Sequence, residues 1–344
     1  MENSERANEI GTGPLTVLVT GGTGFVGTYV CKHLAARGDV PLAGGLEDFS
    51  SEGHFVLCEH GDKVRFVHCD VTDAEEVEVL CRSNAVDAIV HSAGFVGHDA
   101  SLSDPARTYQ VNIGGAVNVL EAARKAGVPK VILVSSNAAY HEKEYAPFDE
   151  RHRTTSLRAG NPNAHYGTAK MAAEQIGLAY HTFHGIDVTA LRVTAVYGFG
   201  MNVPMFVKPM VEGVARGETV AIPSGGRTPR DYTYIDDVVS GILAVLDADT
   251  RDLEQRIFNM SSGVLVTAGE IAALMRRLAP GAAVSIADEA TPAERANIAQ
   301  RAPLSSAAAL KVFGYAPDYS IDAGIAAYLD DMTRFLVREV APSA

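Results

Sequence analysis

Residues 20–27 read Thr-Gly-Gly-Thr-Gly-Phe-Val-Gly, and this stretch indicates the fold more clearly than any other. It joins an apolar run over residues 15–20, expected to be a strand, to a helical pattern over residues 24–37. Glycines with the spacing G-x-x-G-x-x-G let the chain turn tightly, approach a phosphate with its backbone and pack the helix closely on the strand. The N-terminus of the helix offers free N–H groups to an anion. We therefore expect this turn to bind a dinucleotide through Gly21, Thr23, Gly24, Phe25, Val26 and Gly27.

Short apolar runs alternate with helical patterns through the first 198 residues. Further strands are expected over residues 40–43, 64–68, 88–91, 131–135 and 187–192. Helices are expected from Asp73, whose side chain can cap the first turn, and over residues 104–126 and 166–183. Strands separated by helices of this length form right-handed βαβ units with parallel strands. The pattern predicts an α/β fold built on a doubly wound parallel Rossmann sheet.

After residue 198, prolines interrupt shorter elements, which predicts a smaller C-terminal substrate lobe. The expected division is a flexible N-terminus over residues 1–14, a dinucleotide-binding domain over 15–198 and a mostly substrate-binding lobe over 199–344. The lobe is expected to be discontinuous, because segments near residues 231–260 look like elements that return to the sheet. The last helix, expected over residues 321–340, carries an apolar face of Ile325, Leu329, Met332 and Phe335.

Composition and charge exclude several classes of protein. Of the 344 residues, 47% are hydrophobic and 21% are charged, which is ordinary for a globular chain. The 29 basic and 42 acidic residues give a net charge of −13, and no basic run suits nucleic acid or anionic lipid. No apolar stretch is long enough for a transmembrane helix. We therefore expect neither nucleic acid nor a membrane as a partner.

Thiol and imidazole groups indicate neither redox nor metal chemistry. The four cysteines form no C-x-x-C pair, which is typical of reduced thiols in a cytoplasmic protein. His181 and His184 lie three residues apart on an expected helix, but no carboxylate or Cys completes a metal site with them. The sequence predicts a cytoplasmic protein without a metal.

The end of the second strand bears on the choice of cofactor. Dinucleotide sites usually place an acidic residue there, which binds the adenosine ribose. Here Gly44 and Gly45 occupy the place, and whether Glu47 or Asp48 reaches the ribose stays open. No Lys or Arg between residues 37 and 63 could pair with a 2′-phosphate, which favours NAD over NADP.

Further cofactor contacts are expected at the ends of the third and fourth strands. Asp70 and Val71 follow the third strand and are well placed for the adenine ring, although a turn that leads into the next helix is the alternative. Ala93 and Gly94 follow the fourth strand and are small enough for a cofactor to lie across its end.

Tyr166 and Lys170 form the expected centre of the chemistry. Four residues apart on a helix, a phenol and an ammonium share one face. The ammonium, helped by a positive nicotinamide ring, is expected to lower the pKa of the phenol, so that the tyrosine can take a proton from a substrate hydroxyl. Ser136 ends the fifth strand and can hydrogen-bond the reacting oxygen, with capping of the strand end as the alternative.

Taken in order, these motifs resemble those of the extended short-chain dehydrogenases/reductases, in the NAD-dependent epimerase/dehydratase family, and are similar to the UDP-glucose 4-epimerases among them. The resemblance covers about residues 15–335. It rests on TGGTGFVG (20–27), CDVTD (69–73), VHSAG (90–94), DPARTYQVNIGGAVNVLEAAR (104–124), VILVSSNAAY (131–140), YGTAKMAAE (166–174), LRVTAVYG (191–198) and RDYTYIDDV (230–238).

The resemblance implies a role for each matching residue. Tyr166 would be the catalytic acid/base, and Lys170 would be its electrostatic partner and a ligand of the nicotinamide ribose. Ser136 would orient the reacting oxygen, Asn112 would support the site from the long helix, and Ser135 would be among the cofactor contacts. The substrate contacts would be Ser136, Asn137, Asn202, Arg230 and Arg301, with the two arginines holding the diphosphate of a nucleotide sugar.

Departures from the family pattern narrow the reaction. Asn137 and Ala138 stand where 4,6-dehydratases carry Asp-Glu, where decarboxylases carry a Glu and where 3,5-epimerases carry a Cys, so those reactions are disfavoured. A nucleotide-sugar 4-epimerase with bound NAD and a transient keto intermediate is favoured. Ala195 replaces an Asn of UDP-sugar 4-epimerases, which leaves open a dehydrogenase of a small hydroxy acid or amino alcohol, similar to threonine dehydrogenase, or a sugar dehydrogenase/reductase. By analogy, the helices over 104–126 and 166–183 would pair in a homodimer.

Overall fold

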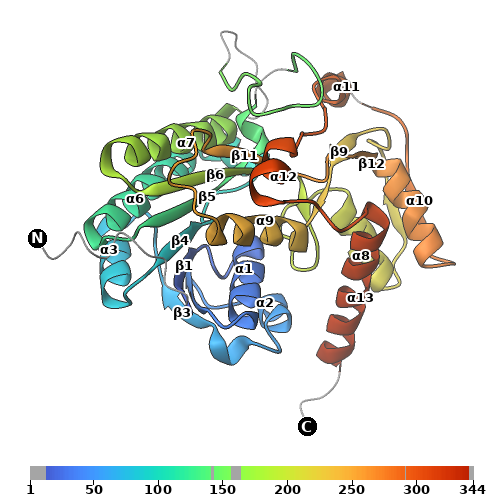
Figure 1. Ribbon diagram of the computed structural model, residues 1–344. Coiled ribbons are helices and arrows are strands. Elements are labelled where there is room, and N and C mark those ends of the chain that lie inside the picture. Colours follow the sequence, from blue (N-terminus) through green and yellow to red (C-terminus); the bar gives the residue numbers. More distant parts are fainter. Residues whose placement is uncertain (1–12, 141–142, 156–163, 291, 341–344) are drawn as a thin grey trace, which may run out of the picture.

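A seven-stranded sheet forms the centre of the molecule (Figure 1). The computed structural model describes residues 13–140, 143–155, 164–290 and 292–340. All strand pairs of this sheet are parallel. In spatial order the strands are β11 (Ile257–Met260), β6 (Asp187–Val193), β5 (Lys130–Ser136), β4 (Ala88–His91), β1 (Thr16–Thr20), β2 (Val40–Gly45) and β3 (Arg65–His68). The predicted doubly wound parallel sheet is confirmed, and its strand order reverses between β1 and β4, where such sheets bind ligands.

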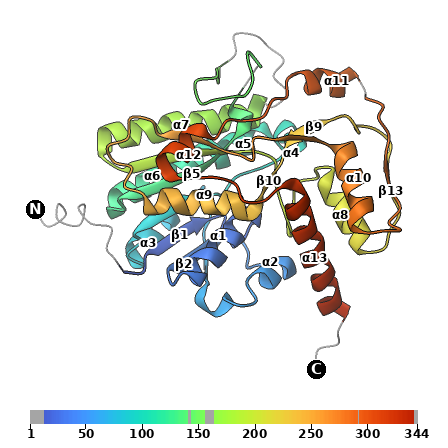
Figure 2. The same ribbon diagram turned by 45° about the vertical axis from the view of Figure 1, so that its right-hand side comes forward.

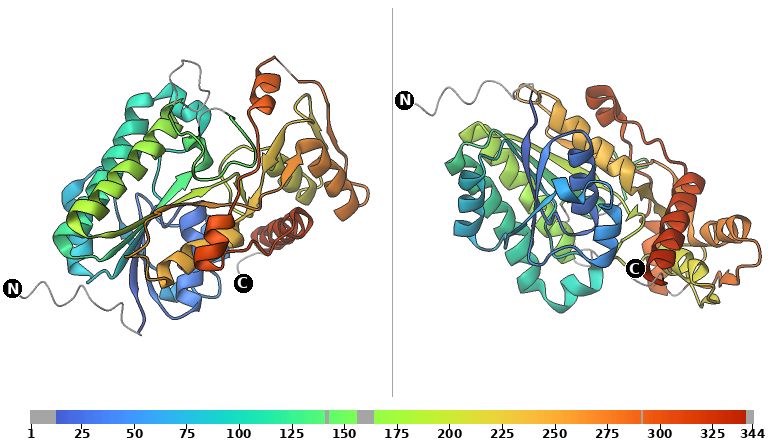
Figure 3. Two further views of the ribbon diagram at one scale, coloured as in Figure 1. Left: turned by 45° about the horizontal axis from the view of Figure 1, so that its top comes forward. Right: turned by 90° about the horizontal axis from the view of Figure 1, so that it is seen from below.

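Helices cover both faces of the sheet (Figure 1; Figure 3, left). On one face, α1 (Phe25–Ala36) and α9 (Ile235–Asp247) pack against each other. On the other face lie α3 (Ala74–Ser83), α6 (Gly115–Ala126) and α7 (Ala164–His184). Each face has its own cluster of buried apolar side chains. Both α9 and β11 come from the C-terminal half of the chain. The helix α9 packs on the sheet, and the strand β11 pairs with β6 and extends the sheet on that side.

The helix expected over residues 104–126 is present and contains a local distortion. After α4 (His98–Ser103) and α5 (Pro105–Tyr109), the chain makes a π-helical turn, Gln110–Gly114, and only then enters α6. The prediction of a helix over these residues is therefore confirmed, but the sequence pattern does not reveal the π-helical turn within it. A π turn holds one more residue than an α turn, and such turns are frequent at functional sites. Here the turn contains Asn112, which is only 2% exposed.

A smaller lobe lies beside the sheet (Figure 2). Its short strands pair two by two: β7 (Val196–Tyr197) with β10 (Thr233–Tyr234), β8 (Val220–Ile222) with β13 (Val284–Ile286), and β9 (Pro229–Asp231) with β12 (Leu265–Thr267). The remaining helices are α2 (Ser51–Val56), which follows β2, and α8 (Val207–Ala215), α10 (Ala268–Leu278), α11 (Pro292–Ala299), α12 (Ala307–Phe313) and α13 (Ile321–Val340). An isolated parallel bridge between Phe148 and Leu304 joins the segment after β5 to this lobe.

The last helix, α13, packs on α8 and turns its predicted apolar face inward. Ile325, Met332 and Phe335 are buried, and Leu329 is partly buried. Within the described ranges, no helix has both the length and the apolar character needed to cross a bilayer. These ranges also contain no group of three metal-ligating side chains. Most of the segment expected to be flexible, residues 1–14, lies outside the described residues.

Candidate active site

The glycine-rich turn lies where β1 meets α1. Gly21 has a φ of +67°, and a Cβ there would lie 2.7 Å from the backbone nitrogen of Ala93, which follows β4. A Cβ on Gly27 would lie 2.1 Å from the carbonyl oxygen of Gly21, so only glycine lets the helix pack this closely. The N-cap residue of α1, Gly24, provides no side-chain cap, and the first turn contains no acidic residue. The free N–H groups of that turn therefore suit the pyrophosphate of a dinucleotide.

The residues expected at the adenine end follow β3. The carboxylate of Asp70 accepts hydrogen bonds from the backbone nitrogen (2.9 Å) and the hydroxyl (2.7 Å) of Thr72, which lower its pKa. Val71 is 5% exposed, its side chain packs against Gly115 and its carbonyl accepts from Asn118. Thr23, Phe25 and Val26 are partly buried at the turn itself.

The side chain of Asn112 forms hydrogen bonds with the backbone of the segment that follows β4. Its Oδ1 accepts from the backbone N–H of Phe95 at 2.9 Å, and its Nδ2 donates to the carbonyl of Phe95 at 3.1 Å. A Cβ on Gly94 would lie 2.9 Å from Asn112 Oδ1 and 3.6 Å from Lys170 Nζ. Because Gly94 has no side chain, the side-chain amide of Asn112 and the ammonium of Lys170 can both lie close to its backbone.

Tyr166 and Lys170 lie on the first turns of α7. Lys170 Nζ donates to the carbonyl of Val134 in β5 at 2.9 Å and lies 5.8 Å from the centre of the Tyr166 ring. Burial lowers the pKa of Lys170 to about 8, and the carboxylate of Glu174 opposes this shift. Burial also raises the pKa of Tyr166 to about 12, against a smaller opposite effect of a hydrogen bond with Ser136. Burial is thus the largest influence on the pKa of Tyr166 in the chain by itself, and the lowering expected from the ammonium together with a nicotinamide ring stays a prediction.

The two serines at the end of β5 have different surroundings. The Ser136 hydroxyl accepts from the backbone N–H of Ala138 at 3.1 Å, so it caps the following turn, and the same side chain acts to lower the pKa of Tyr166. Asn137 is partly buried beside it, with Oδ1 3.4 Å from Ser136 Oγ. Ser135 is buried, and its hydroxyl donates to the carboxylate of Glu174 at 2.5 Å. Any contact of Ser135 with a cofactor would therefore come from its backbone.

Sequence reasoning missed a buried ion pair behind Lys170. Glu174 accepts from Nε and Nη2 of Arg192, in β6, at 2.9 and 2.6 Å, and both side chains are at most 3% exposed. The guanidinium of Arg192 also lies 4.6 Å from the ring centre of Tyr140. The one available signal was that Glu174 follows Lys170 by four residues on the same helix, which places the two on one face.

Two arginines meet in the smaller lobe. Burial lowers the pKa of Arg301 to about 10, and the positive charge of Arg230 adds to this effect. Both guanidinium groups also lower the pKa of Tyr232, against the larger effect of burial, which raises it to about 12. Arg230 Nε and the Tyr232 hydroxyl are buried without a hydrogen-bond partner among the described residues. Two positive charges near each other, together with the unpartnered Nε of Arg230, suit an anion. Asn202, expected nearby, is exposed.

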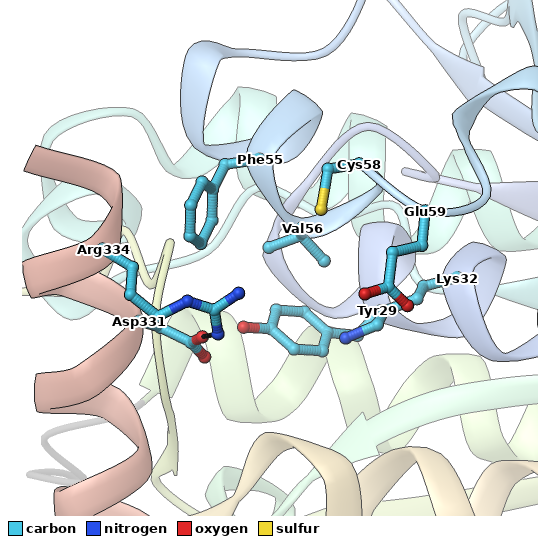
Figure 4. A pocket seen from close by; sticks show the side chains of 8 residues that line it. All are labelled: Tyr29, Lys32, Phe55, Val56, Cys58, Glu59, Asp331 and Arg334. Atoms are coloured by element: carbon cyan, nitrogen blue, oxygen red, sulfur yellow. Dashed lines mark hydrogen bonds and ion pairs between the residues drawn. The ribbon is translucent and has the colours of Figure 1, made fainter. Parts of the chain in front are cut away.

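A separate hollow of about 110 Å³ lies between α1, α2 and α13 (Figure 4). It is on the α1 side of the sheet, opposite the face covered by α7, which carries Tyr166. Its charged lining consists of Lys32 and Arg334 on one hand and Glu59 and Asp331 on the other. With equal numbers of basic and acidic groups, this hollow does not select an anionic substrate.

The fold and these side chains define a class of protein: a dinucleotide-binding α/β enzyme with tyrosine, lysine and serine gathered at the end of β5. The chain belongs to the NAD-dependent epimerase/dehydratase family, whose model matches residues 17–261. The resemblance seen in the sequence is thereby confirmed. NAD is the cofactor of this family, and the uncapped N-terminus of α1 with its glycine-rich turn fits the pyrophosphate of NAD.

Named relatives agree with this family. UDP-glucuronate 4-epimerase 3 of Arabidopsis thaliana is 30% identical over 284 residues, which cover 76% of this chain and 64% of the relative. UDP-glucuronate 4-epimerase of Thermodesulfobacterium geofontis (strain OPF15) is 28% identical over 253 residues, 72% of this chain and 75% of the relative. The crystal structure of Thermus thermophilus UDP-glucose 4-epimerase in complex with NAD has 27% identity and a TM-score of 0.77, covering 92% of this chain and 99% of that one. This chain spans slightly under two-thirds of the length of the Arabidopsis relatives.

Proposed function

We propose that the protein is an NAD-dependent nucleotide-sugar 4-epimerase. It oxidises the C4 hydroxyl of the sugar to a ketone and reduces the same carbon from the opposite face. The observation that carries the proposal is the meeting of three groups at the end of β5: the phenol of Tyr166, the hydroxyl of Ser136 that acts to lower the pKa of this phenol, and the ammonium of Lys170. The named relatives that are UDP-glucuronate and UDP-glucose 4-epimerases support this substrate class.

We assign the cofactor site to the C-terminal ends of strands β1 to β5. The pyrophosphate lies at the turn made by Gly21, Thr23, Gly24, Phe25, Val26 and Gly27. The rest of the dinucleotide contacts Asp70, Val71, Ala93, Gly94, Ser135, Tyr166 and Lys170. When bound, NAD accepts a hydride from the reacting carbon and returns it.

Tyr166 is the proposed acid and base. Its phenolate oxygen takes the proton of the C4 hydroxyl as the C–H bond breaks, and gives the proton back when the ketone is reduced. The phenol is protonated at neutral pH when its pKa is about 12, so it needs positive charge nearby to act as a base. Lys170 supplies one such charge, and Ser136 donates to the carbonyl oxygen as it forms. Asn112 acts indirectly, because it holds Phe95 and thereby the backbone beside Gly94.

The nucleotide end of the substrate is proposed to bind in the smaller lobe. Arg230 and Arg301 hold the diphosphate, because their two charges are kept close together and Arg230 Nε has no partner among the described residues. Asn137 lies beside Ser136 and can hydrogen-bond the sugar. Asn202 is exposed and contributes only if it turns toward the nucleotide.

A product assay with the purified holoenzyme and a Tyr166→Phe variant tests the proposal. We expect the wild type to convert UDP-glucuronate or UDP-glucose into its 4-epimer without net accumulation of reduced nicotinamide. Tyr166→Phe should lower kcat by at least about 100-fold, because the acid and base is lost, while the chain keeps NAD. Steady accumulation of reduced nicotinamide with a free alcohol would instead identify a dehydrogenase. Full activity of the variant would remove Tyr166 from the mechanism.

The larger organisation is part of the same proposal. Residues 15–198, with elements returning from 231–260, form the NAD domain, and residues 199–344 form most of the substrate lobe. The surface of α5, α6 and α7 pairs two chains into a homodimer, by analogy with similar proteins. The cytoplasm is the proposed location, and it agrees with four free cysteines, three of them buried.

A further inference from the structure

We propose that the hydroxyl of Thr23 replaces the usual acidic side chain as the partner of the adenosine ribose of NAD. The inference rests on the proposed function, in which NAD binds at the glycine-rich turn. It starts from the end of β2, where dinucleotide sites place an Asp or Glu that binds the ribose hydroxyls. In this chain β2 ends in Gly44 and Gly45.

The glycine-rich turn is held against this end of β2. The N–H of Gly22 donates to the carbonyl of Gly44 at 2.8 Å. A Cβ on Gly22 would lie 2.6 Å from the Cα of Ala43, so the two backbones are in direct contact. β1 and β2 are also in parallel register, with Thr20 opposite Gly44. The residue after Gly22, Thr23, is therefore fixed beside the last residue of β2.

The side chain of Thr23 fills the space that an acidic side chain at position 45 would need. A Cβ on Gly45 would lie 2.2 Å from Thr23 Oγ1 and 3.0 Å from Thr23 Cγ2. The main-chain oxygen of Glu47 would be 3.2 Å from the same Cβ. An Asp at position 45 could not enter without displacing Thr23. The hydroxyl thus lies where the missing acidic side chain would begin.

Two nearby carboxylates, Glu47 and Asp48, are the rival partners of the ribose. The side chains of Glu47 and Asp48 are exposed, and Asp48 Oδ1 accepts from the backbone N–H of Phe49 at 2.7 Å, in the turn before α2. A threonine hydroxyl can both donate to and accept from a ribose hydroxyl. Because it is uncharged, its hydrogen bond is weaker than that of a carboxylate, and it does not repel a 2′-phosphate.

Equilibrium dialysis of the full chain against radiolabelled NAD tests the role of Thr23. Thr23→Val removes the hydroxyl and keeps the shape, and we expect it to weaken NAD binding by about threefold to tenfold. Thr23→Ser keeps the hydroxyl, and Glu47→Gln tests the rival carboxylate; both should bind within about twofold of the wild type. Equal binding by the Val and Ser variants, or a loss only in Glu47→Gln, would overturn the inference. A wild type that binds no NAD would overturn the proposed function itself, so the two failures are distinguishable.

A second pair of variants tests the overlap between positions 23 and 45. Gly45→Asp alone should weaken NAD binding, because its Cβ meets Thr23 Oγ1. The double variant Thr23→Ala/Gly45→Asp makes room for the carboxylate. It should regain affinity for NAD and discriminate against NADP at least about tenfold more than the wild type does. If Gly45→Asp alone binds NAD as tightly as the wild type, the two side chains do not compete for one place and the inference fails.

Discussion

Lys170 shows at the scale of one residue how burial and hydrogen bonding set the chemistry. Its ammonium donates to the carbonyl of Val134 and is 7% exposed, and this burial lowers its pKa to about 8. Glu174, one helical turn away, opposes the shift through its negative charge. The lysine is therefore charged at neutral pH, but by a small margin compared with a free lysine.

This margin predicts the pH dependence of activity. A lowered pKa means that the ammonium is present below about pH 8 and lost as the pH rises through that value. We expect kcat/KM to fall with rising pH from about 8, because the neutral amine no longer favours the phenolate of Tyr166. Initial rates measured from neutral to strongly basic pH check this. A kcat/KM that stays constant up to about pH 10, the region where an unperturbed lysine titrates, would contradict it.

The positions of the proposed catalytic groups could be predicted from the sequence, but their protonation could not. The sequence points to Tyr166, Lys170 and Ser136 because strand ends and helical spacing are local properties of the chain. The pKa of Tyr166 depends on how much of the folded molecule surrounds the phenol, and the spacing of two residues does not contain this. The same holds for Glu174, whose partner Arg192 lies on another element.

Among the elements, the π-helical turn Gln110–Gly114 has the clearest consequence for the site. Asn112 lies in this turn and makes two hydrogen bonds to the backbone of Phe95. The hydrophobic pattern of residues 104–126 predicts a helix correctly, yet it does not reveal one inserted residue, because the apolar positions on either side still follow a helical period. By contrast, the N-terminal cap of α3 by Asp73 depends only on the residue type at that position, and this prediction is confirmed.

Replacing Asn112 tests what this turn contributes. Asn112→Ala leaves the N–H and C=O of Phe95 without these partners, and we expect it to lower the free energy of unfolding by about 1–3 kcal/mol. It should also lower kcat, since the backbone beside Gly94 loses its support. Gln110→Ala, in the same turn but exposed, is the matched control. Denaturation curves and kcat values are compared for the two variants. If both variants have the same free energy of unfolding and the same kcat, Asn112 does not support the backbone at Phe95.

At the scale of the whole molecule, a buried network of charged side chains lies at the N-terminal ends of β5 and β6. The candidate active site lies at the opposite, C-terminal ends of the strands. Asp187, the first residue of β6, accepts from Arg256 at 2.6 Å and from Thr250, and Lys130, the first residue of β5, lies 3.6 Å away. Lys130 also donates to carbonyl groups at and just after the C-terminal end of α9, including that of Val245 at 2.9 Å. The network ties a helix from the C-terminal half to the sheet.

Removing the central carboxylate should destabilise the whole fold. Asp187→Ala leaves two buried cations, Lys130 and Arg256, without it, and we expect the free energy of unfolding to fall by about 3–5 kcal/mol. Asp249→Ala removes an exposed carboxylate paired with Arg251 on the surface, and it should change stability little. Chemical denaturation of the two variants makes the comparison. A similar stability for both would show that the network does not hold α9 to the sheet.

The sequence also predicts the parallel sheet of the whole molecule better than the smaller lobe. Long alternating segments define β1 to β6 and their helices, whereas β7 to β10 are only two or three residues long. Strands this short carry no readable period, and their partners, such as β13 for β8, lie far along the chain. The convergence of Arg230 and Arg301 was for this reason implied only by resemblance.

The proposed mechanism requires that the hydrogen removed from C4 of a nucleotide sugar returns to the same carbon within the closed site. To test this requirement, the holoenzyme is incubated with UDP-glucuronate or UDP-glucose in deuterated water. Proton NMR then observes the product directly. We predict that the 4-epimer accumulates and that its C4 position keeps ordinary hydrogen. Deuterium at C4, or no epimer from either sugar nucleotide, would contradict the mechanism.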